Sequence, residues 1–370
     1  MKDRNLLKQI LEATRHIWDQ PGTRRSVRKS FASVLDCGTP ALGWELYASE
    51  TEEKRCYHRC KSRVCPSCGY RATLQWLEEQ EASLPDVPYS GVVFTMPSEL
   101  WPIFKRNRHL LHDLPVLAAG VIQQWISMKY AARAIIMAVP HTFGGDLKFN
   151  SHVHLLVSVG GLHESDGRWI PNLPLNKEAL MRMWRYAVIC HLRLALKADV
   201  LKSDLSMQEF LNLLSRAYES ERHPRWIIFV DGIVSKAHFL RYAARYVRRP
   251  PIATWRLLRV TDTEVEFVAK DTKASLLVPT RATLPRFVRL LAAHVPDEYR
   301  HGIRYFGLQA PRTKSLIRAA LFVLLGETRR PKPERLSWRN SILKYFGFDP
   351  LIDSRGQEMH WVRRESVFAR

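Results

Sequence analysis

Four of the six cysteines stand close together, in the segment CYHRCKSRVCPSCG that begins at Cys56. Successive members are separated by three, four and two residues. Zinc takes four soft ligands in a tetrahedron, and the Lys and Arg residues around these cysteines disfavour their burial without a metal. The spacing therefore predicts a structural Zn²⁺ site with these ligands: Cys56, Cys60, Cys65 and Cys68.

The fourth ligand of this site stays open from the sequence alone. His58 and Cys37 are alternatives to Cys56. The Cys-Pro-Ser-Cys-Gly run is typical of a zinc knuckle, and its Gly69 is expected to supply the positive φ that such a turn needs. A metal site also explains how so short a segment could fold.

A second candidate site is the pair His152 and His154 at the start of an expected strand. Alternate residues of a strand face the same side, so both imidazoles point one way while Val153 points to the other. Two imidazoles on one face are half of a metal site. Taken alone, the pair is more simply explained as two surface histidines, and the meaning depends on its context.

That context is the segment 235–249, which is expected to form a helix. Tyr242 and Tyr246 are four residues apart and therefore share one helical face, and apolar residues occupy another. An arginine-rich neighbourhood favours phosphate binding. The candidate DNA-binding residues are Arg245, Arg248 and Arg249.

Together these groups suit phosphoryl transfer on DNA. A divalent cation held by His152 and His154 would polarise the scissile phosphate. A tyrosine would attack it as covalent nucleophile, and arginines would stabilise the charge of the transition state. The overall charge agrees, because Lys and Arg total 57 against 36 Asp and Glu, a net of +21. So large a surplus indicates a polyanionic partner, most often nucleic acid.

The elements that must position these groups follow from hydrophobic periodicity. The segments 5–18 and 71–81 are expected to be helices, and YSGVVFTM, AIIMAVPHTF, HVHLLVSVGGL and RWIIFVDG strands. Strands alternating with helices predict an α+β fold. We expect three consecutive domains: a helical zinc-binding domain over 1–85, a catalytic domain over 89–310 and a basic C-terminal extension over 311–370. Arg and Lys of that extension are expected to contribute to DNA binding.

No run of residues is long and apolar enough to span a membrane, and the charged N-terminal segment is unlike a secretory signal. The sequence therefore predicts a cytoplasmic, nucleoid-associated protein.

The chain resembles the rolling-circle transposases of the insertion-sequence-ninety-one family and the related ISCR elements. Seven blocks carry the resemblance in the family's order: CGTPALG, CKSRVCPSCG, VVFTMPSELWP, HTFGGDLKFNSHVHLLVSVGGL, YAARYVRRPPIA, VEFVAKD and HGIRYFGL. The resemblance implies an N-terminal zinc-binding domain and a catalytic domain of the HUH endonuclease type. In that fold two histidines lie on a central strand of an antiparallel sheet and face a helix that carries the tyrosines.

By position, the resemblance makes His152 and His154 ligands of a catalytic Mg²⁺ or Mn²⁺ ion, and Tyr242 and Tyr246 the nucleophiles. HUH enzymes usually add a third polar ligand, for which His141 is the candidate and Asp146 and Asn150 are alternatives. The family nicks and rejoins single-stranded DNA at transposon ends and targets through a 5′-phosphotyrosine intermediate. The competing interpretations are a catalytically silent zinc-containing DNA-binding protein and a plasmid-type replication initiator.

Overall fold

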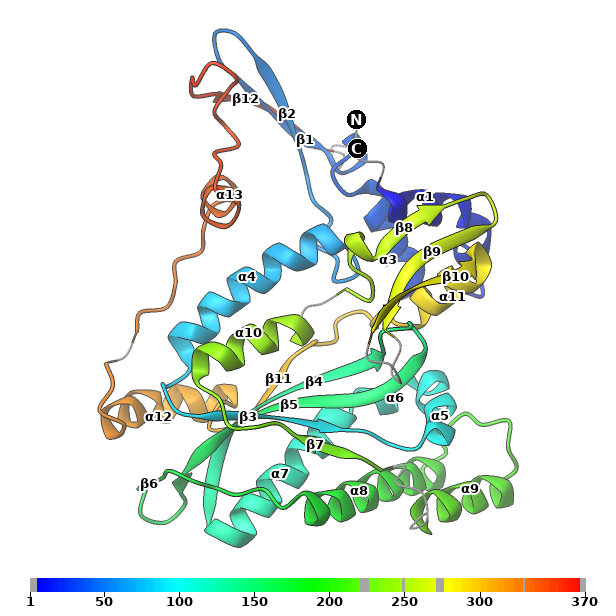
Figure 1. Ribbon diagram of the computed structural model, residues 1–370, viewed down its shortest axis with the longest axis vertical. Coiled ribbons are helices and arrows are strands. Elements are labelled where there is room, and N and C mark those ends of the chain that lie inside the picture. Colours follow the sequence, from blue (N-terminus) through cyan, green and yellow to red (C-terminus); the bar gives the residue numbers. More distant parts are fainter. Residues whose placement is uncertain (1–4, 220–225, 248–249, 271–275, 329, 367–370) are drawn as a thin grey trace. The chain divides into compact units, whose positions relative to one another are not determined.

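The computed structural model describes residues 5–219, 226–247, 250–270, 276–328 and 330–366, which form two compact units (Figure 1). Unit 1 comprises Met1–Glu79, Arg248–Pro296 and Lys332–Arg370. Unit 2 comprises Gln80–Val247 and Asp297–Pro331. Both combine helices with antiparallel sheets, which confirms the expected α+β class.

Unit 1 contains two three-stranded antiparallel sheets, in the orders β12-β1-β2 and β10-β9-β8. Its strands are β1 (Trp44–Ala48), β2 (Glu53–Tyr57), β8 (Leu257–Val260), β9 (Glu264–Lys270), β10 (Leu277–Thr283) and β12 (His360–Glu365). Its helices are α1 (Leu6–Ala13), α2 (Arg15–Trp18), α3 (Arg25–Asp36), α11 (Leu284–Ala293) and α13 (Trp338–Phe346), with 3₁₀ turns η1 (Pro40–Leu42) and η3 (Thr254–Arg256). Helix α4 (Pro66–Ser83) begins in unit 1 and ends in unit 2.

Unit 1 joins segments that are far apart in the sequence, and it cuts across the expected ranges 1–85, 89–310 and 311–370. The first helices pack against α11 and β8, and Arg24 donates to the carbonyls of Ala292 at 2.8 Å and Val295 at 3.1 Å. The N-terminal helices are short, and they cannot bury their hydrophobic faces against one another alone. Strand β8 and helix α11, which were expected within the catalytic domain, therefore complete the core of the N-terminal helices.

The C-terminal residues are also more regular than expected. The sequence shows little periodicity after Leu325, yet Trp338–Phe346 forms α13 and His360–Glu365 forms β12. Strand β12 pairs with β1, so residues of the expected basic extension belong to the sheet of unit 1. The sequence of β12, HWVRRE, has no two-residue hydrophobic alternation and all its residues are exposed, so only the pairing with β1 defines it as a strand.

Unit 2 is built on one sheet in the order β11-β4-β5-β3-β7, with β6 paired to β5 (Figure 1). Its strands are β3 (Tyr89–Phe94), β4 (Ala132–Phe143), β5 (Phe149–His163), β6 (Trp169–Ile170), β7 (Ile228–Val230) and β11 (Arg304–Gly307). Its helices are η2 (Ser98–Leu100), α5 (Trp101–Arg106), α6 (Arg108–Leu111), α7 (Leu114–Tyr130), α8 (Lys177–Lys197), α9 (Met207–Glu219), α10 (Lys236–Val247) and α12 (Pro311–Leu324). The four strands expected from the sequence are all present.

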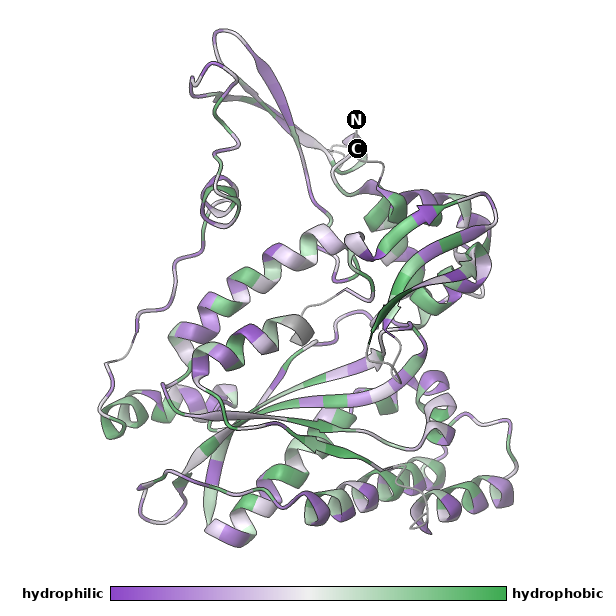
Figure 2. Cartoon of the chain, viewed as in Figure 1, coloured by the Kyte–Doolittle hydropathy of each residue, from purple (hydrophilic) through white to green (hydrophobic). Residues whose placement is uncertain are grey.

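One face of this sheet packs on the hydrophobic core, and the other face carries the histidines. Val153, Leu155 and Val157 of β5 point into a continuous hydrophobic core formed with α7 and α8. Figure 2 shows hydrophobic and hydrophilic residues alternating around α8, as a helix with one buried side requires. Helix α10 lies on the opposite side of the sheet from α7 and α8 (Figure 1). That opposite face is the one that carries the histidines.

No helix in the described parts of the chain is both long and apolar enough to cross a membrane.

Candidate functional site

The structure brings four cysteines of unit 1 into one group, Cys37, Cys60, Cys65 and Cys68. Cys37 directly follows α3, Cys60 follows β2, and Cys65 and Cys68 flank the first residues of α4. The thiols of Cys65 and Cys68 therefore lie at a helix N-terminus, where the positive end of the helix dipole favours thiolates.

The sulfur positions fit a tetrahedral zinc ion. Zn–S bonds of about 2.3 Å require sulfur atoms about 3.8 Å apart at the corners of a tetrahedron. The Sγ atom of Cys68 lies 3.7 Å from those of Cys37 and Cys60, and the Sγ atoms of Cys37 and Cys65 are 3.8 Å apart. The geometry of this group is thus suited to zinc.

Cys56 does not belong to this group, so the predicted set of four is wrong at that position and Cys37 replaces it. Cys56 lies in β2 opposite Glu45, and burial raises its pKa. His58, the other alternative, makes its Nδ1 contact with the carbonyl of Leu42 at 3.0 Å. Cys37 precedes Cys60 by more than twenty residues, and the loop that follows α3 comes back beside the end of β2, where Gly38 hydrogen-bonds to His58.

The expected turn glycine is also a different one. Gly69 lies within α4, whereas Gly38, which directly follows Cys37, has a φ of +69°. The amide of Gly38 donates to the carbonyl of His58 at 2.9 Å and so ties the Cys37 loop to the end of β2.

In unit 2 the sheet places three histidines on one face. His141 of β4 is directly opposite His152 of β5, and His154 follows two residues later. Residues opposite one another, and alternate residues of one strand, share a face of the sheet. The ring centroids are 4.6 Å apart for His141 and His154, 5.0 Å for His152 and His154, and 5.5 Å for His141 and His152. Their ligand nitrogens lie within 4.8 Å of one another.

The surroundings favour the neutral form of His152 and His154, the form that a metal ligand needs. Burial lowers the pKa of His152, and burial followed by the neighbouring His141 and His152 lowers the pKa of His154 well below its ordinary value. Nδ1 of His152 lies 2.8 Å from the carbonyl oxygen of Asn150. A carbonyl only accepts, so Nδ1 carries the proton and Nε2 keeps its lone pair for a ligand.

The two other candidates for the third ligand differ. Asp146 lies in the turn between the strands, where its carboxylate contacts Lys148, and it is not part of the histidine group. Asn150 precedes the histidine pair on β5, at a point where the pairing with β4 is irregular, and its Oδ1 is buried without a hydrogen-bond partner among the described residues. The histidine group thus contains His141 besides the pair expected from the sequence.

Helix α10 covers this face beside the histidines. Its Phe239 stacks on Tyr89 of β3, with ring centroids 4.5 Å apart, and Ala243 is buried with it. This apolar contact leaves Tyr242 half-buried in a pocket whose lining includes Val93, Val139 and His154. Tyr242 and a histidine of the candidate metal group therefore line one pocket.

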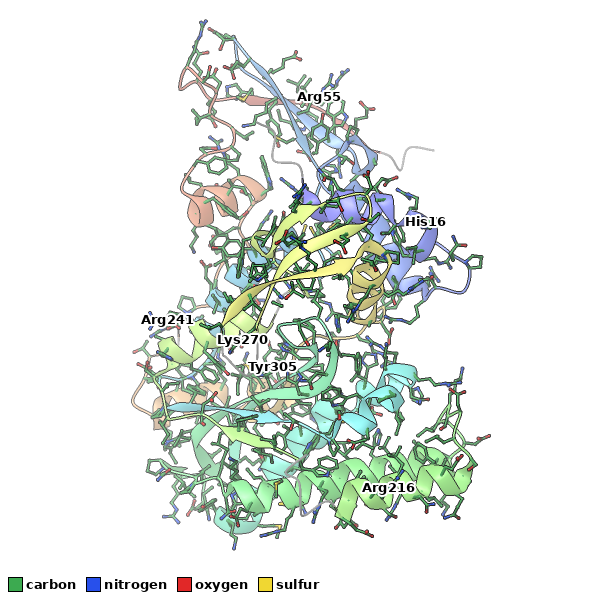
Figure 3. The ribbon with its side chains drawn as sticks, turned by 45° about the vertical axis from the view of Figure 1, so that its right-hand side comes forward. His16, Arg55, Arg216, Arg241, Lys270 and Tyr305 are labelled. Atoms are coloured by element: carbon green, nitrogen blue, oxygen red, sulfur yellow. The ribbon has the colours of Figure 1, made fainter. Side chains whose placement is uncertain are left out.

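Tyr246 and the candidate arginines lie partly or wholly outside the residues that the structure describes. The backbone at Arg245 and Tyr246 continues α10, but their side chains lie beyond what the structure describes, as do Arg248 and Arg249 entirely. Arg241, next to Tyr242, is exposed on α10 (Figure 3).

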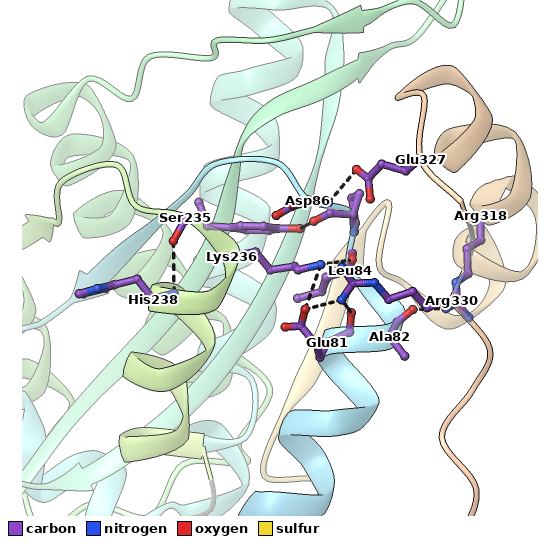
Figure 4. A network of polar contacts seen from close by, with 12 residues as sticks. Glu81, Ala82, Leu84, Asp86, Ser235, Lys236, His238, Arg318, Glu327 and Arg330 are labelled. Carbon is purple, nitrogen blue, oxygen red and sulfur yellow. Dashed lines mark hydrogen bonds and ion pairs between the residues drawn. The ribbon is translucent and has the colours of Figure 1, made fainter.

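A polar network that the sequence did not suggest fixes the start of α10 (Figure 4). Lys236 is the first residue of the helix, and its side chain is only 3% exposed. Its Nζ lies 3.3 Å from a carboxylate oxygen of Glu81 and 3.4 Å from the carbonyl of Leu84. Arg330 also binds Glu81. A cation at a helix N-terminus is disfavoured by the helix dipole. A lysine in the first turn of the expected helix was therefore the one feature of the sequence that pointed to a carboxylate partner.

Comparison with known proteins adds two family matches. Residues 136–316 match the model of a family described as "Putative transposase", and residues 9–96 match that of a transposase zinc-binding domain of the IS91 type. The transposase for insertion sequence element IS801 of Pseudomonas savastanoi pv. phaseolicola is 31% identical over 324 residues, which cover 83% of this chain and 76% of that protein. The putative transposase y4qJ of Sinorhizobium fredii is 30% identical over 332 residues, which cover 83% and 82%. No solved structure matches the chain.

Proposed function

Because the chain belongs to the family of IS91- and IS801-type transposases, we propose that it cuts and rejoins single-stranded DNA through a covalent phosphotyrosine intermediate, as in rolling-circle transposition. The observation that carries the proposal is the pocket that Tyr242 and His154 line together. Tyr242 thus lies beside a candidate metal ligand, the arrangement that attack on a metal-bound phosphodiester would require.

The histidine face would hold a divalent cation through His141, His152 and His154, with Asn150 as a further oxygen donor. The donor set fits such an ion, because burial lowers the pKa of His152 and of His154 and so favours their neutral forms, and the Oδ1 atom of Asn150 is buried without a partner among the described residues. Nitrogen-rich ligand sets favour Mn²⁺ over Mg²⁺, which prefers oxygen. When bound, the ion supplies Lewis-acid polarisation of the scissile phosphate.

Tyr242 is proposed to attack phosphorus through its phenol oxygen. The 5′-phosphate becomes linked to tyrosine, and the bond to the 3′ oxygen breaks and leaves a free 3′ hydroxyl. Attack by a 3′ hydroxyl on the phosphotyrosine then rejoins DNA and returns the phenol. Tyr246 lies one helical turn later and would serve a second strand in the same way.

The apolar lining of the pocket, which includes Val93, Val139 and Ala243, would exclude water from the phosphotyrosine. Water is the competing nucleophile, and its exclusion preserves the intermediate for rejoining. The zinc group in unit 1 is proposed to be structural, because four protein ligands leave no open position.

The test is covalent capture on single-stranded oligonucleotides taken from both flanks of the gene. With Mn²⁺ present, wild-type protein should form an adduct that survives a denaturing gel. Tyr242→Phe and Tyr246→Phe should each impair transfer, and the double variant should form no adduct, because Phe removes only the attacking oxygen. Tyr186→Phe is a matched control, since Tyr186 is 61% exposed on α8 of the same unit. Adduct formation by the double variant would place the nucleophile elsewhere.

A further inference from the structure

A run of basic residues leads from the edge strand β2 into the zinc group of unit 1. The ten residues from Lys54 to Arg63 contain five Lys or Arg and no Asp or Glu. Lys54, Arg55, Arg59 and Lys61 are exposed. Repulsion between so many positive charges on a short stretch raises the free energy of the folded chain unless an anion balances them. We call Lys54–Arg63 the basic strip.

Strand β12 adds to this charge from the other end of the chain. Arg55 of β2 and Arg363 of β12 both lie opposite Leu46 of β1, on either side of it. Their guanidinium carbons are 5.1 and 5.7 Å from the ring centroid of Trp44, which is itself buried. Within the described chain neither guanidinium has a carboxylate partner. The indole therefore orients two cations whose N–H donors remain available.

The fold holds β12 in this position. Gly43 has a φ of +83°, and a Cβ atom there would come within 2.5 Å of the carbonyl oxygen of Glu365. Lys54 donates to the carbonyl of Pro350 at 2.8 Å, and Ser49 donates to the Asp353 carboxylate at 2.6 Å. Arg363 is thus part of a built surface and not of a solvated tail.

An aromatic residue shares the face. Tyr57 is two residues from Arg55 on β2 and directly opposite Trp44, so it lies on the same side of the sheet, and its side chain is 36% exposed. Arginines that contact phosphates, beside an aromatic ring that stacks on a base, are the combination found in proteins that bind unpaired nucleic acid. Charge complementarity and the exposed ring both favour a DNA single strand over an acidic membrane.

We propose that Arg55, Arg363 and Tyr57, with the basic strip, form a single-strand DNA-binding surface of unit 1, separate from the tyrosine pocket of unit 2. The two guanidiniums bind phosphates and Tyr57 stacks on a base. The choice of DNA as ligand rests on the proposed function, but the surface itself makes and breaks no bond. Its role is to retain a strand whose cleavage occurs elsewhere on the protein.

The test measures equilibrium binding of a fluorescent single-stranded oligonucleotide against salt, without added divalent metal. Each phosphate contact contributes about −0.7 to the log–log slope, so Arg55→Gln/Arg363→Gln should make the slope less steep by about 1.4. At 0.15 M salt the same two contacts correspond to a loss of roughly tenfold in affinity. Tyr57→Ala should weaken single-strand binding and leave the slope unchanged, because it removes stacking and no charge.

The matched control is Arg286→Gln/Arg289→Gln, which removes the same charge from exposed positions on α11 of unit 1. Its slope should stay that of wild type. Each single Gln variant should change the slope by about 0.7, so the result does not depend on folding of the double variant, and elemental zinc analysis verifies each protein. Equal loss in the control, unchanged single-strand affinity, or loss only towards duplex DNA or acidic vesicles would overturn the proposal. Covalent capture is scored separately, so failure of the tyrosine chemistry leaves this test intact.

Discussion

The anchor at the start of α10 makes an asymmetric prediction about stability. Lys236 is 3% exposed, whereas Glu81 is 42% exposed and also binds Arg330. Removal of the Glu81 carboxylate leaves the Lys236 ammonium buried without a counter-charge. Removal of the Lys236 ammonium leaves a carboxylate that still contacts Arg330 and water. Glu81→Gln should therefore destabilise unit 2 more than Lys236→Met, although both delete the same ion pair.

The magnitudes follow from burial. Stranding a fully buried charge costs about 3–5 kcal/mol. Because the Leu84 carbonyl and the new amide oxygen still accept from Lys236, we expect Glu81→Gln to cost about 2–3 kcal/mol. Met has nearly the length of Lys and is apolar, and the lost pair with a half-exposed acid is worth about 0–1 kcal/mol. Lys236→Met should thus stay within about 1 kcal/mol of wild type.

Hydrogen–deuterium exchange of peptides from α10 and β3 across a urea series measures the stability of this region. The double variant should resemble Lys236→Met, since no buried charge is then left to strand. Arg241→Met, which removes an exposed charge on the same helix, should stay within about 0.5 kcal/mol of wild type. A Lys236→Met protein at least as unstable as Glu81→Gln would refute the argument that burial of the ammonium dominates.

The other predictions concern the two candidate metal groups. Purified protein should contain about one zinc per chain, and elemental analysis should find it lost in Cys37→Ser as in Cys65→Ser but retained in Cys56→Ser. Zinc loss in Cys56→Ser with retention in Cys37→Ser would contradict the sulfur geometry. Replacing His152 and His154 with Ala should abolish metal-dependent adduct formation. Most single-strand binding, measured by anisotropy, should remain, because the Lys and Arg side chains that bind phosphates are at other positions. Adducts that persist in that variant would exclude these histidines from the reaction.

Local patterns predicted the residues of each group that lie close in sequence. The spacing of Cys60, Cys65 and Cys68 depends on one loop and one helix start, and the alternation of His152 and His154 depends only on the two-residue repeat of a strand. Cys37 could be named only as an alternative, because it approaches the other cysteines through a contact between the loop after α3 and the end of β2. Contacts of that kind leave no periodic signal in the chain.

The same limit explains the domain boundaries. Hydrophobic periodicity correctly predicted four strands of unit 2, β3, β4, β5 and β7. It could not show that β8 and α11 pack against the N-terminal helices, because periodicity reports which face is buried and not what buries it. Strand β12 is the extreme case, since its burial is slight and its place comes from pairing with β1.

The position of the tyrosines along α10 argues for unequal roles. Tyr242 is six residues from the Lys236 anchor and lies level with Ala243, whose burial fixes that turn against β3. Tyr246 is one residue from Val247, the last residue of α10 and of the first segment of unit 2. Precise attack requires a nucleophile held by its surroundings, and the helix provides that support at Tyr242. We therefore expect Tyr242 to make the first attack at the histidine group, and Tyr246, at the end of α10, to make the second.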